Sequence, residues 1–271
     1  AFMVIALWHV NPYSMPDWDG SVPLGDHLRF FGFAQIYDET TTIRGLGVAW
    51  TLGVELVFYL ALPGIAWILI RASGTADDLH SFRRRQFLGI GLLATAGFGF
   101  RLLAFERAVP WTTPASPIGF LPWFAAGMAL AVASAVRDRG FEPRRQRRVL
   151  DTQLGGLSVA LATFIVMAVA VEPQRTNRAV TAMHVEFVLS ICVAVGLLAP
   201  IVLGSTTAKD RITATLTSPL FQFLGRISFG IYLWHEIWIR VVSLWADQGF
   251  VPSQRLAQAL LVAVLTLTAA V

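Results

Sequence analysis

Charged residues are scarce in this sequence. Asp, Glu, Lys and Arg make up 14% of the 271 residues, whereas hydrophobic residues make up 55% and the mean hydropathy is +0.62. This composition excludes an ordinary soluble domain of such length. It indicates a polytopic membrane protein.

Cysteine is nearly absent. Cys192 is the one cysteine of the chain, and it lies within an apolar run. A disulfide framework and a thiolate metal site are therefore excluded, and we predict no metal site.

A charged leader is also lacking. The chain begins within an apolar run at Ala1 and stops within another at Val271. We expect a fragment that lacks the first helices and the C-terminal end of its domain, and such a start gives no basis for arguing a signal peptide.

Apolar runs long enough to cross a bilayer recur along the chain. A membrane-spanning helix needs about 20 apolar residues. The sequence predicts an all-α, polytopic transmembrane helix bundle with about eight spans, in a single domain over 1–271. The predicted spans are 1–11, 49–70, 86–105, 117–136, 154–171, 182–204, 219–245 and 256–271.

Lys and Arg alternate between rich and poor loops. The connections 71–85, 137–153 and 205–218 hold twelve of them, whereas 12–48 and the remaining connections hold six. Because Lys and Arg favour cytoplasmic loops, the first set is predicted to be cytoplasmic.

Two connections stand out. Segment 12–48 is the longest, and we predict an external loop with a short interfacial helix. Loop 137–153 is strongly basic. Beside a membrane such a loop sets topology or contacts anionic lipid, so we predict no nucleic-acid partner.

Ionisable residues within the predicted spans are candidates for function, because charge at membrane depth is costly. Glu55 lies about 8 to 9 Å below the outer end of its helix. His235 lies about 21 Å up a hydrocarbon core of about 30 Å, which is a similar depth. We therefore predict that both can share one polar pocket in the outer half of the membrane.

Each candidate has a competing structural interpretation. Glu55 could be a buried carboxylate paired with Arg101 or Arg226. His235 could be an interfacial anchor hydrogen-bonded to a backbone carbonyl. Glu236 and Arg240 are expected to form a local salt bridge, and His184 is expected to be reached by solvent at an external helix end.

Two segments resemble motifs of the membrane acyltransferase 3 family. Residues 50–63, WTLGVELVFYLALP, resemble its Trp-Ser-Leu-x-x-Glu-x-x-Phe-Tyr-Leu-x-x-Pro segment. Residues 223–235, FLGRISFGIYLWH, are similar to its Leu-Gly-x-x-Ser-Tyr-x-x-Tyr-Leu-x-His signature. Both occur in the family's order, and the resemblance covers nearly the whole chain.

The resemblance implies a bundle of about ten helices in the cell inner (plasma) membrane. It implies an integral membrane O-acyltransferase that moves an acyl group, expected to be acetyl, from acyl-CoA to a hydroxyl of an extracytoplasmic carbohydrate or lipid-linked glycan. Acyl-CoA is then the donor substrate, no cofactor is bound, and the bilayer is the other partner. The family's first helix carries an Arg and a His that nothing here matches, since His9 lies too close to Trp50. We therefore expect this chain alone to be inactive.

The predicted catalytic and substrate-binding residues are taken from the two motifs. Glu55 and His235 are the predicted catalytic residues, with Glu55 orienting a base or binding acceptor hydroxyls and His235 lining the acceptor side. Arg226 could pair with a phosphate or carbonyl of the donor, or only set topology. Aromatic residues in these motifs could instead belong to the membrane-interface belt. The predicted substrate-binding residues are Trp50, Tyr59, Arg226, Ser228 and Tyr232.

A proton-coupled transporter is the alternative, because it also needs buried Glu, His and Arg in a helical bundle. Transporters often show repeated halves with matching broken helices, and no such pair is found here. A membrane scaffold without chemistry would leave the charges within the spans without a purpose.

Overall fold

The computed structural model describes residues 24–38, 41, 48–74, 79–107, 109–110, 112–138, 152–170, 180–203, 211–251 and 254–270. The first predicted span with His9, the start of segment 12–48 and most of the basic loop 137–153 lie outside these residues. Within them all regular secondary structure is helical, as predicted. It divides into two compact units, residues 1–59 with 215–271 and residues 60–214.

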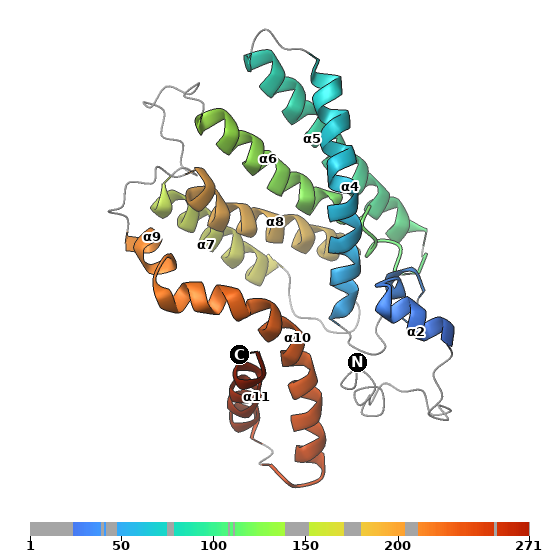
Figure 1. The fold of residues 1–271 in the computed structure, drawn as a ribbon, viewed down its shortest axis with the longest axis vertical. Coiled ribbons are helices and arrows are strands. Elements are labelled where there is room, and N and C mark those ends of the chain that lie inside the picture. The colour runs from blue at the N-terminus through green and yellow to red at the C-terminus, as the bar shows by residue number, and fades with distance from the viewer. Residues whose placement is uncertain are drawn as a thin grey trace. The chain divides into compact units, whose positions relative to one another are not determined.

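Seven predicted spans coincide with helices, which are coloured along the chain in Figure 1. In a bilayer every backbone amide must be satisfied within its own helix, so long apolar runs fold in this way. The helices are α4 (Ala49–Ser73), α5 (Leu79–Glu106), α6 (Leu121–Asp138), α7 (Gln153–Ala170), α8 (Val180–Leu203), α10 (Pro219–Asp247) and α11 (Arg255–Ala270).

Three helices are long and apolar enough to cross a membrane by length and composition, among the residues that the structure describes. They are Ala49–Ser73, His80–Glu106 and Thr181–Leu203. Large apolar side chains on them are exposed within the chain, for example Leu60 at 73% and Leu92 at 70%. These surfaces fit a helical membrane bundle, in which lipid covers them.

The first unit contains shorter elements beside α10 and α11. Helix α2 (Leu24–Phe31) and the 3-10 helix η1 (Gln35–Tyr37) lie in the predicted external loop. The Phe33 carbonyl lies only 2.6 Å from where a Cβ on Gly53 would be. Glycine at position 53 therefore lets this segment pack against the start of α4.

The hairpin of α10 and α11 is built around a tight helix end. Gly249 has φ +76°, and the amide of Phe250 donates to the Trp245 carbonyl over 2.8 Å. The amide of Gly249 donates to the Ala246 carbonyl over 3.1 Å. This pair of bonds is a Schellman motif, which ends the helix and reverses the chain.

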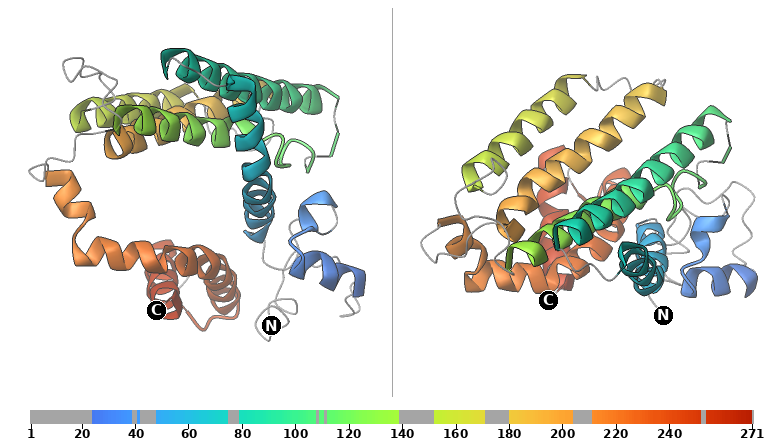
Figure 2. Two further views of the ribbon diagram at one scale, coloured as in Figure 1. Left: turned by 45° about the horizontal axis from the view of Figure 1, so that its top comes forward. Right: turned by 90° about the horizontal axis from the view of Figure 1, so that it is seen from above.

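The second unit is a row of helices in the order α5, α6, α8 and α7, seen side by side in Figure 2. A Cβ on Gly196 of α8 would lie 2.9 Å from the Ala160 amide of α7 and 3.0 Å from the Gly156 carbonyl. Small residues at such positions let membrane helices approach closely.

Two predicted loops are partly helical, so those boundaries were wrong. Loop 71–85 was expected to hold Arg83, but α5 begins at Leu79 and contains it. Helix α9 (Arg211–Leu216) lies within the predicted loop 205–218. Hydropathy predicts only the apolar part of a helix. A helix can continue beyond that part through arginines such as Arg83, because arginine has a high helix propensity.

Candidate functional site

The two motif segments meet where the start of α4 contacts the middle of α10, within the first unit. The Val48 amide donates a hydrogen bond to Glu236 Oε2 over 2.6 Å. The first amides of a helix have no partner within the helix. A carboxylate at this end also interacts favourably with the helix dipole, so Glu236 caps α4 from a residue 188 positions away.

Glu236 has a second partner. Its Oε1 forms the salt bridge with Arg240 that the sequence predicts. The carboxylate is half-buried, and each of its oxygens has a partner. Glu236 therefore holds the start of α4 on α10.

Two hydroxyl groups complete this contact. Thr51 Oγ1 lies 2.6 Å from the Tyr232 hydroxyl oxygen. The Val48 carbonyl lies 2.9 Å from Thr51 Oγ1 and 3.1 Å from the Tyr232 hydroxyl, and it accepts a hydrogen bond. The hydroxyl groups of Thr51 and Tyr232 have one hydrogen each, and these two hydrogens are shared among the three contacts. The two hydroxyl groups and the Val48 carbonyl therefore form one hydrogen-bond network.

His235 lies beside this contact. Its Nδ1 is 2.6 Å from the Tyr232 carbonyl oxygen, and its ring is 5.7 Å from the Tyr232 ring between centroids. A carbonyl only accepts hydrogen bonds, so Nδ1 carries the hydrogen. Nε2 of the neutral ring then has a free lone pair. The hydrogen bond to a backbone carbonyl, which we expected if His235 were an interfacial anchor, is therefore present. It leaves Nε2 available to act on a substrate.

Glu55 lies one turn after Thr51 on the same face of α4. Its side chain is exposed and has no hydrogen bond or ion pair among the described residues. Within the first unit, the pairing of Glu55 with Arg226 is therefore not observed. His235 lies between Tyr232 and Glu236, the α10 residues of the contact, whereas Glu55 follows Thr51 by one turn, and their sharing one pocket stays a prediction.

The other predicted site residues differ in their surroundings. Trp50 is half-buried at the start of α4, and Tyr59 is 61% exposed. Arg226 is exposed on α10. Ser228 is exposed too, and its hydroxyl donates to the Gly225 carbonyl over 2.8 Å. Tyr232, the remaining predicted residue, contacts the start of α4 through its hydroxyl group, as described above.

We predict that Tyr232→Phe and Thr51→Val each lower the free energy of unfolding by about 1 kcal/mol, since each removes hydrogen bonds of this network. The double variant loses less than the sum, because the two hydroxyls share one bond. Unfolding in mixed detergent micelles measures this. Tyr59→Phe is the matched control, because that hydroxyl is on an exposed residue, and strict additivity would contradict the network.

Arg101, in the second unit, lies in an aromatic cage. Its guanidinium carbon is 4.2 Å from the Phe187 ring centroid and 5.1 Å from that of Phe105. Its Nη1 donates to the Pro114 carbonyl over 3.0 Å. Cation–π contacts contribute about 0.5 to 2 kcal/mol each, so this arginine stabilises the packing of α5 and α8.

His184 is a correction to the sequence prediction. It was expected to be open to solvent, but it is only 8% exposed. Phe98 and Phe105 of α5 cover it, with ring centroids at 5.9 and 5.1 Å. Neither ring nitrogen has a hydrogen-bond partner among the described residues. An unsatisfied buried polar group costs about 1 to 3 kcal/mol.

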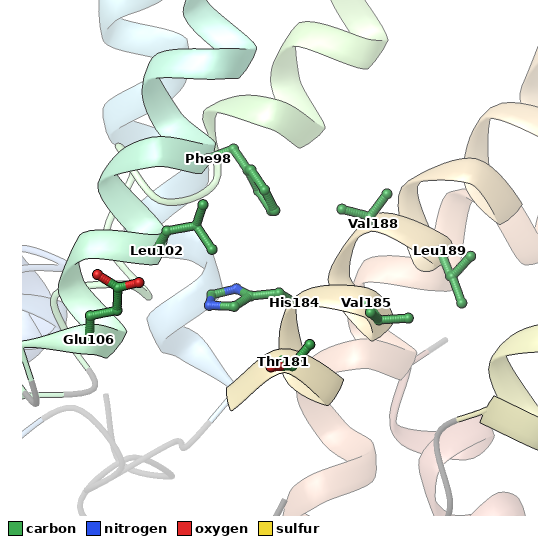
Figure 3. Close-up of a pocket in the computed structure, with 8 residues that line it drawn as sticks. All are labelled: Phe98, Leu102, Glu106, Thr181, His184, Val185, Val188 and Leu189. Atoms are coloured by element: carbon green, nitrogen blue, oxygen red, sulfur yellow. The ribbon is translucent and has the colours of Figure 1, made fainter. Parts of the chain in front are cut away.

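A groove of about 530 Å³ adjoins His184 between α5 and α8 (Figure 3). Its walls are mainly apolar, and Figure 3 shows the imidazole pointing from α8 toward α5. The polar residues at the groove are Glu106, Thr181 and His184.

Sequence reasoning missed three residues in these regions. Thr51 lies within the first motif, where it takes the place of the family's serine, so the motif itself contained a signal. Glu236 was predicted only as a local partner of Arg240. The burial of His184 has no signal in the sequence that we identify, since it depends on two phenylalanines of another helix.

Comparison with known proteins agrees with the two motifs. The family model described as "Acyltransferase domain", that of the acyltransferase 3 family, matches residues 1–271. No curated protein and no solved structure matches the chain. The match favours the acyltransferase prediction over the transporter alternative.

Proposed function

This chain belongs to the acyltransferase 3 family and is a membrane acyltransferase, and on that premise we propose that it acylates an extracytoplasmic glycan. The acyl group is acetyl, and acyl-CoA is its donor. The acceptor is a hydroxyl of a carbohydrate or lipid-linked glycan at the outer side of the cell inner (plasma) membrane. No other cofactor takes part.

The observation that supports this proposal most directly is the contact between the two motif segments. Thr51 and Tyr232 are 181 positions apart in the chain, yet their hydroxyl oxygens are 2.6 Å apart. Residues of both motifs therefore surround one point of the fold, where side chains from two helices can act on one substrate.

The chemistry requires a nucleophile, a base and a leaving group. The acceptor hydroxyl oxygen attacks the thioester carbonyl carbon, a C–O bond forms, and the C–S bond breaks. The hydroxyl proton passes to a base and then to the departing thiolate, which leaves as free coenzyme A. Hydrogen-bond donors lower the barrier by stabilising the oxyanion of the tetrahedral intermediate.

His235 and Glu55 are the residues that we assign to the acceptor. The lone pair on Nε2 of His235 accepts the hydrogen of an acceptor hydroxyl, while the bond from Nδ1 to the Tyr232 carbonyl holds the tautomer. The exposed carboxylate of Glu55 binds further hydroxyls or orients a base.

The remaining predicted residues bind substrate. Arg226 is exposed and carries a positive charge suited to a phosphate of the donor. Trp50 and Tyr59 offer aromatic faces, on which a sugar ring can stack. Ser228 and Tyr232 offer hydroxyl groups, and Tyr232 also holds the start of α4.

The test is a comparison of surface glycans from cells that carry the gene and from a deletion strain. We expect glycans of the parent to be heavier by the mass of acetyl groups, and we expect the wild-type gene to restore that mass in the deletion strain. Mild alkali, which cleaves esters, should remove the difference. Identical glycan masses in the two strains would contradict the proposal.

A further inference from the structure

The groove between α5 and α8 combines an apolar body with one deeply placed polar group. Its volume of about 530 Å³ lies within the range of small-molecule sites, about 300 to 1,000 Å³. The residues that line it include Phe98, Leu102 and Glu106 of α5 and Thr181, His184 and Val188 of α8.

His184 is the feature that points to a ligand. It is more than nine-tenths buried, and both ring nitrogens are without a partner among the described residues. Figure 3 shows its ring directed across the groove, between Phe98 and Glu106.

We propose that this groove binds a membrane lipid that carries a free hydroxyl, a neutral long-chain alcohol. Neutral imidazole has one N–H donor and one acceptor nitrogen, and a hydroxyl group can bond to either. The alkyl chain of the lipid then covers the apolar walls. This site belongs to the second unit, whereas the residues assigned to acyl transfer belong to the first, and the proposal does not rest on that assignment.

Access from the bilayer favours a lipid over a water-soluble ligand. Val185 and Val188 line the groove on α8 and are 40% and 41% exposed. The helix they belong to is long and apolar enough to span a membrane. Lipid chains therefore lie against the open side of the groove, and a ligand enters sideways without crossing water.

The charges around the groove favour a neutral head group over an anionic one. Glu106 lines the groove and is exposed, so its carboxylate repels an anion there. Arg101 is occupied by the Pro114 carbonyl and by the Phe187 ring, and Arg107, which follows Glu106, does not line the groove. A fatty acid or a phosphate is therefore disfavoured.

The test uses a photoreactive long-chain alcohol with a diazirine in its alkyl chain, added to the protein in phosphatidylcholine vesicles. We expect labelling to concentrate on the peptides that contain residues 98–106 and 181–189. Unlabelled hexadecanol should compete at least about tenfold better than hexadecane or hexadecanoate, because one hydrogen bond is worth about that factor. Labelled peptides are identified by mass spectrometry.

The matched variants are His184→Leu, which keeps an apolar side chain of similar size, and His80→Leu, which removes an exposed histidine outside the groove. We expect about a tenfold loss of labelling for the first and none for the second. Equal competition by hexadecanol and hexadecane, or stronger competition by hexadecanoate, would overturn the proposal. Competition with the wild-type protein decides the question even if His184→Leu does not fold.

Discussion

In the full-length protein, Glu55→Gln is expected to reduce acyl transfer about 100-fold or more while membrane expression stays near that of the wild type. The amide has the shape of the carboxylate but lacks its charge, and groups that act in proton transfer or its orientation contribute about 100- to 10,000-fold. Unfolding should be unchanged, because Glu55 is exposed and has no partner among the described residues. Transfer of labelled acetyl from acetyl-CoA in isolated membranes measures this.

Asp247→Asn is the matched control for that experiment, since it neutralises an exposed acid near the end of α10 in the same unit. Its activity should equal that of the wild type. Retained activity in Glu55→Gln would show that the carboxylate has no chemical role. A loss of expression together with activity would instead favour a structural role.

In the full-length protein, His235→Asn is expected to lower activity by about 100-fold or more with little effect on stability. The asparagine amide nitrogen can occupy the position of Nδ1 and donate to the Tyr232 carbonyl, as His235 does over 2.6 Å. Asparagine has no counterpart of Nε2, the nitrogen whose lone pair we assign to the acceptor hydroxyl. The variant therefore separates the anchoring contact from the chemistry.

His235→Leu complements this variant, because it removes both nitrogens. We expect the same loss of activity as in His235→Asn, together with about 1 kcal/mol of destabilisation from the lost hydrogen bond. The same acetyl-transfer assay and unfolding in detergent micelles give the two readings. If His235→Asn retains activity, His235 is only an interfacial anchor.

The acyltransferase prediction rests on residues that are adjacent in the sequence. The motif from Trp50 to Pro63 and the motif that ends at His235 are continuous stretches, so they are visible without any knowledge of packing. The family match over residues 1–271 agrees with them. The Glu236–Arg240 salt bridge was predictable for the same reason, because side chains four residues apart on a helix are neighbours.

The groups that surround these motifs were not predictable in this way. Glu236 caps the start of α4, and the Tyr232 hydroxyl meets Thr51, only because two helices distant in the chain come together. His184 looked open to solvent because it is close to a helix end. It is buried because Phe98 and Phe105 of α5 pack on it.

The sequence by itself therefore determined the membrane class, the approximate positions of the seven long helices and the family. Each of these follows from local chemistry: an apolar run that must satisfy its own backbone in lipid, or a motif of neighbouring residues. Only the tertiary structure decided which side chains meet, which carboxylate caps α4 and which histidine is buried. The reason is that hydropathy records the preference of each residue for lipid, whereas contacts between helices depend on the face that each helix turns toward its neighbours.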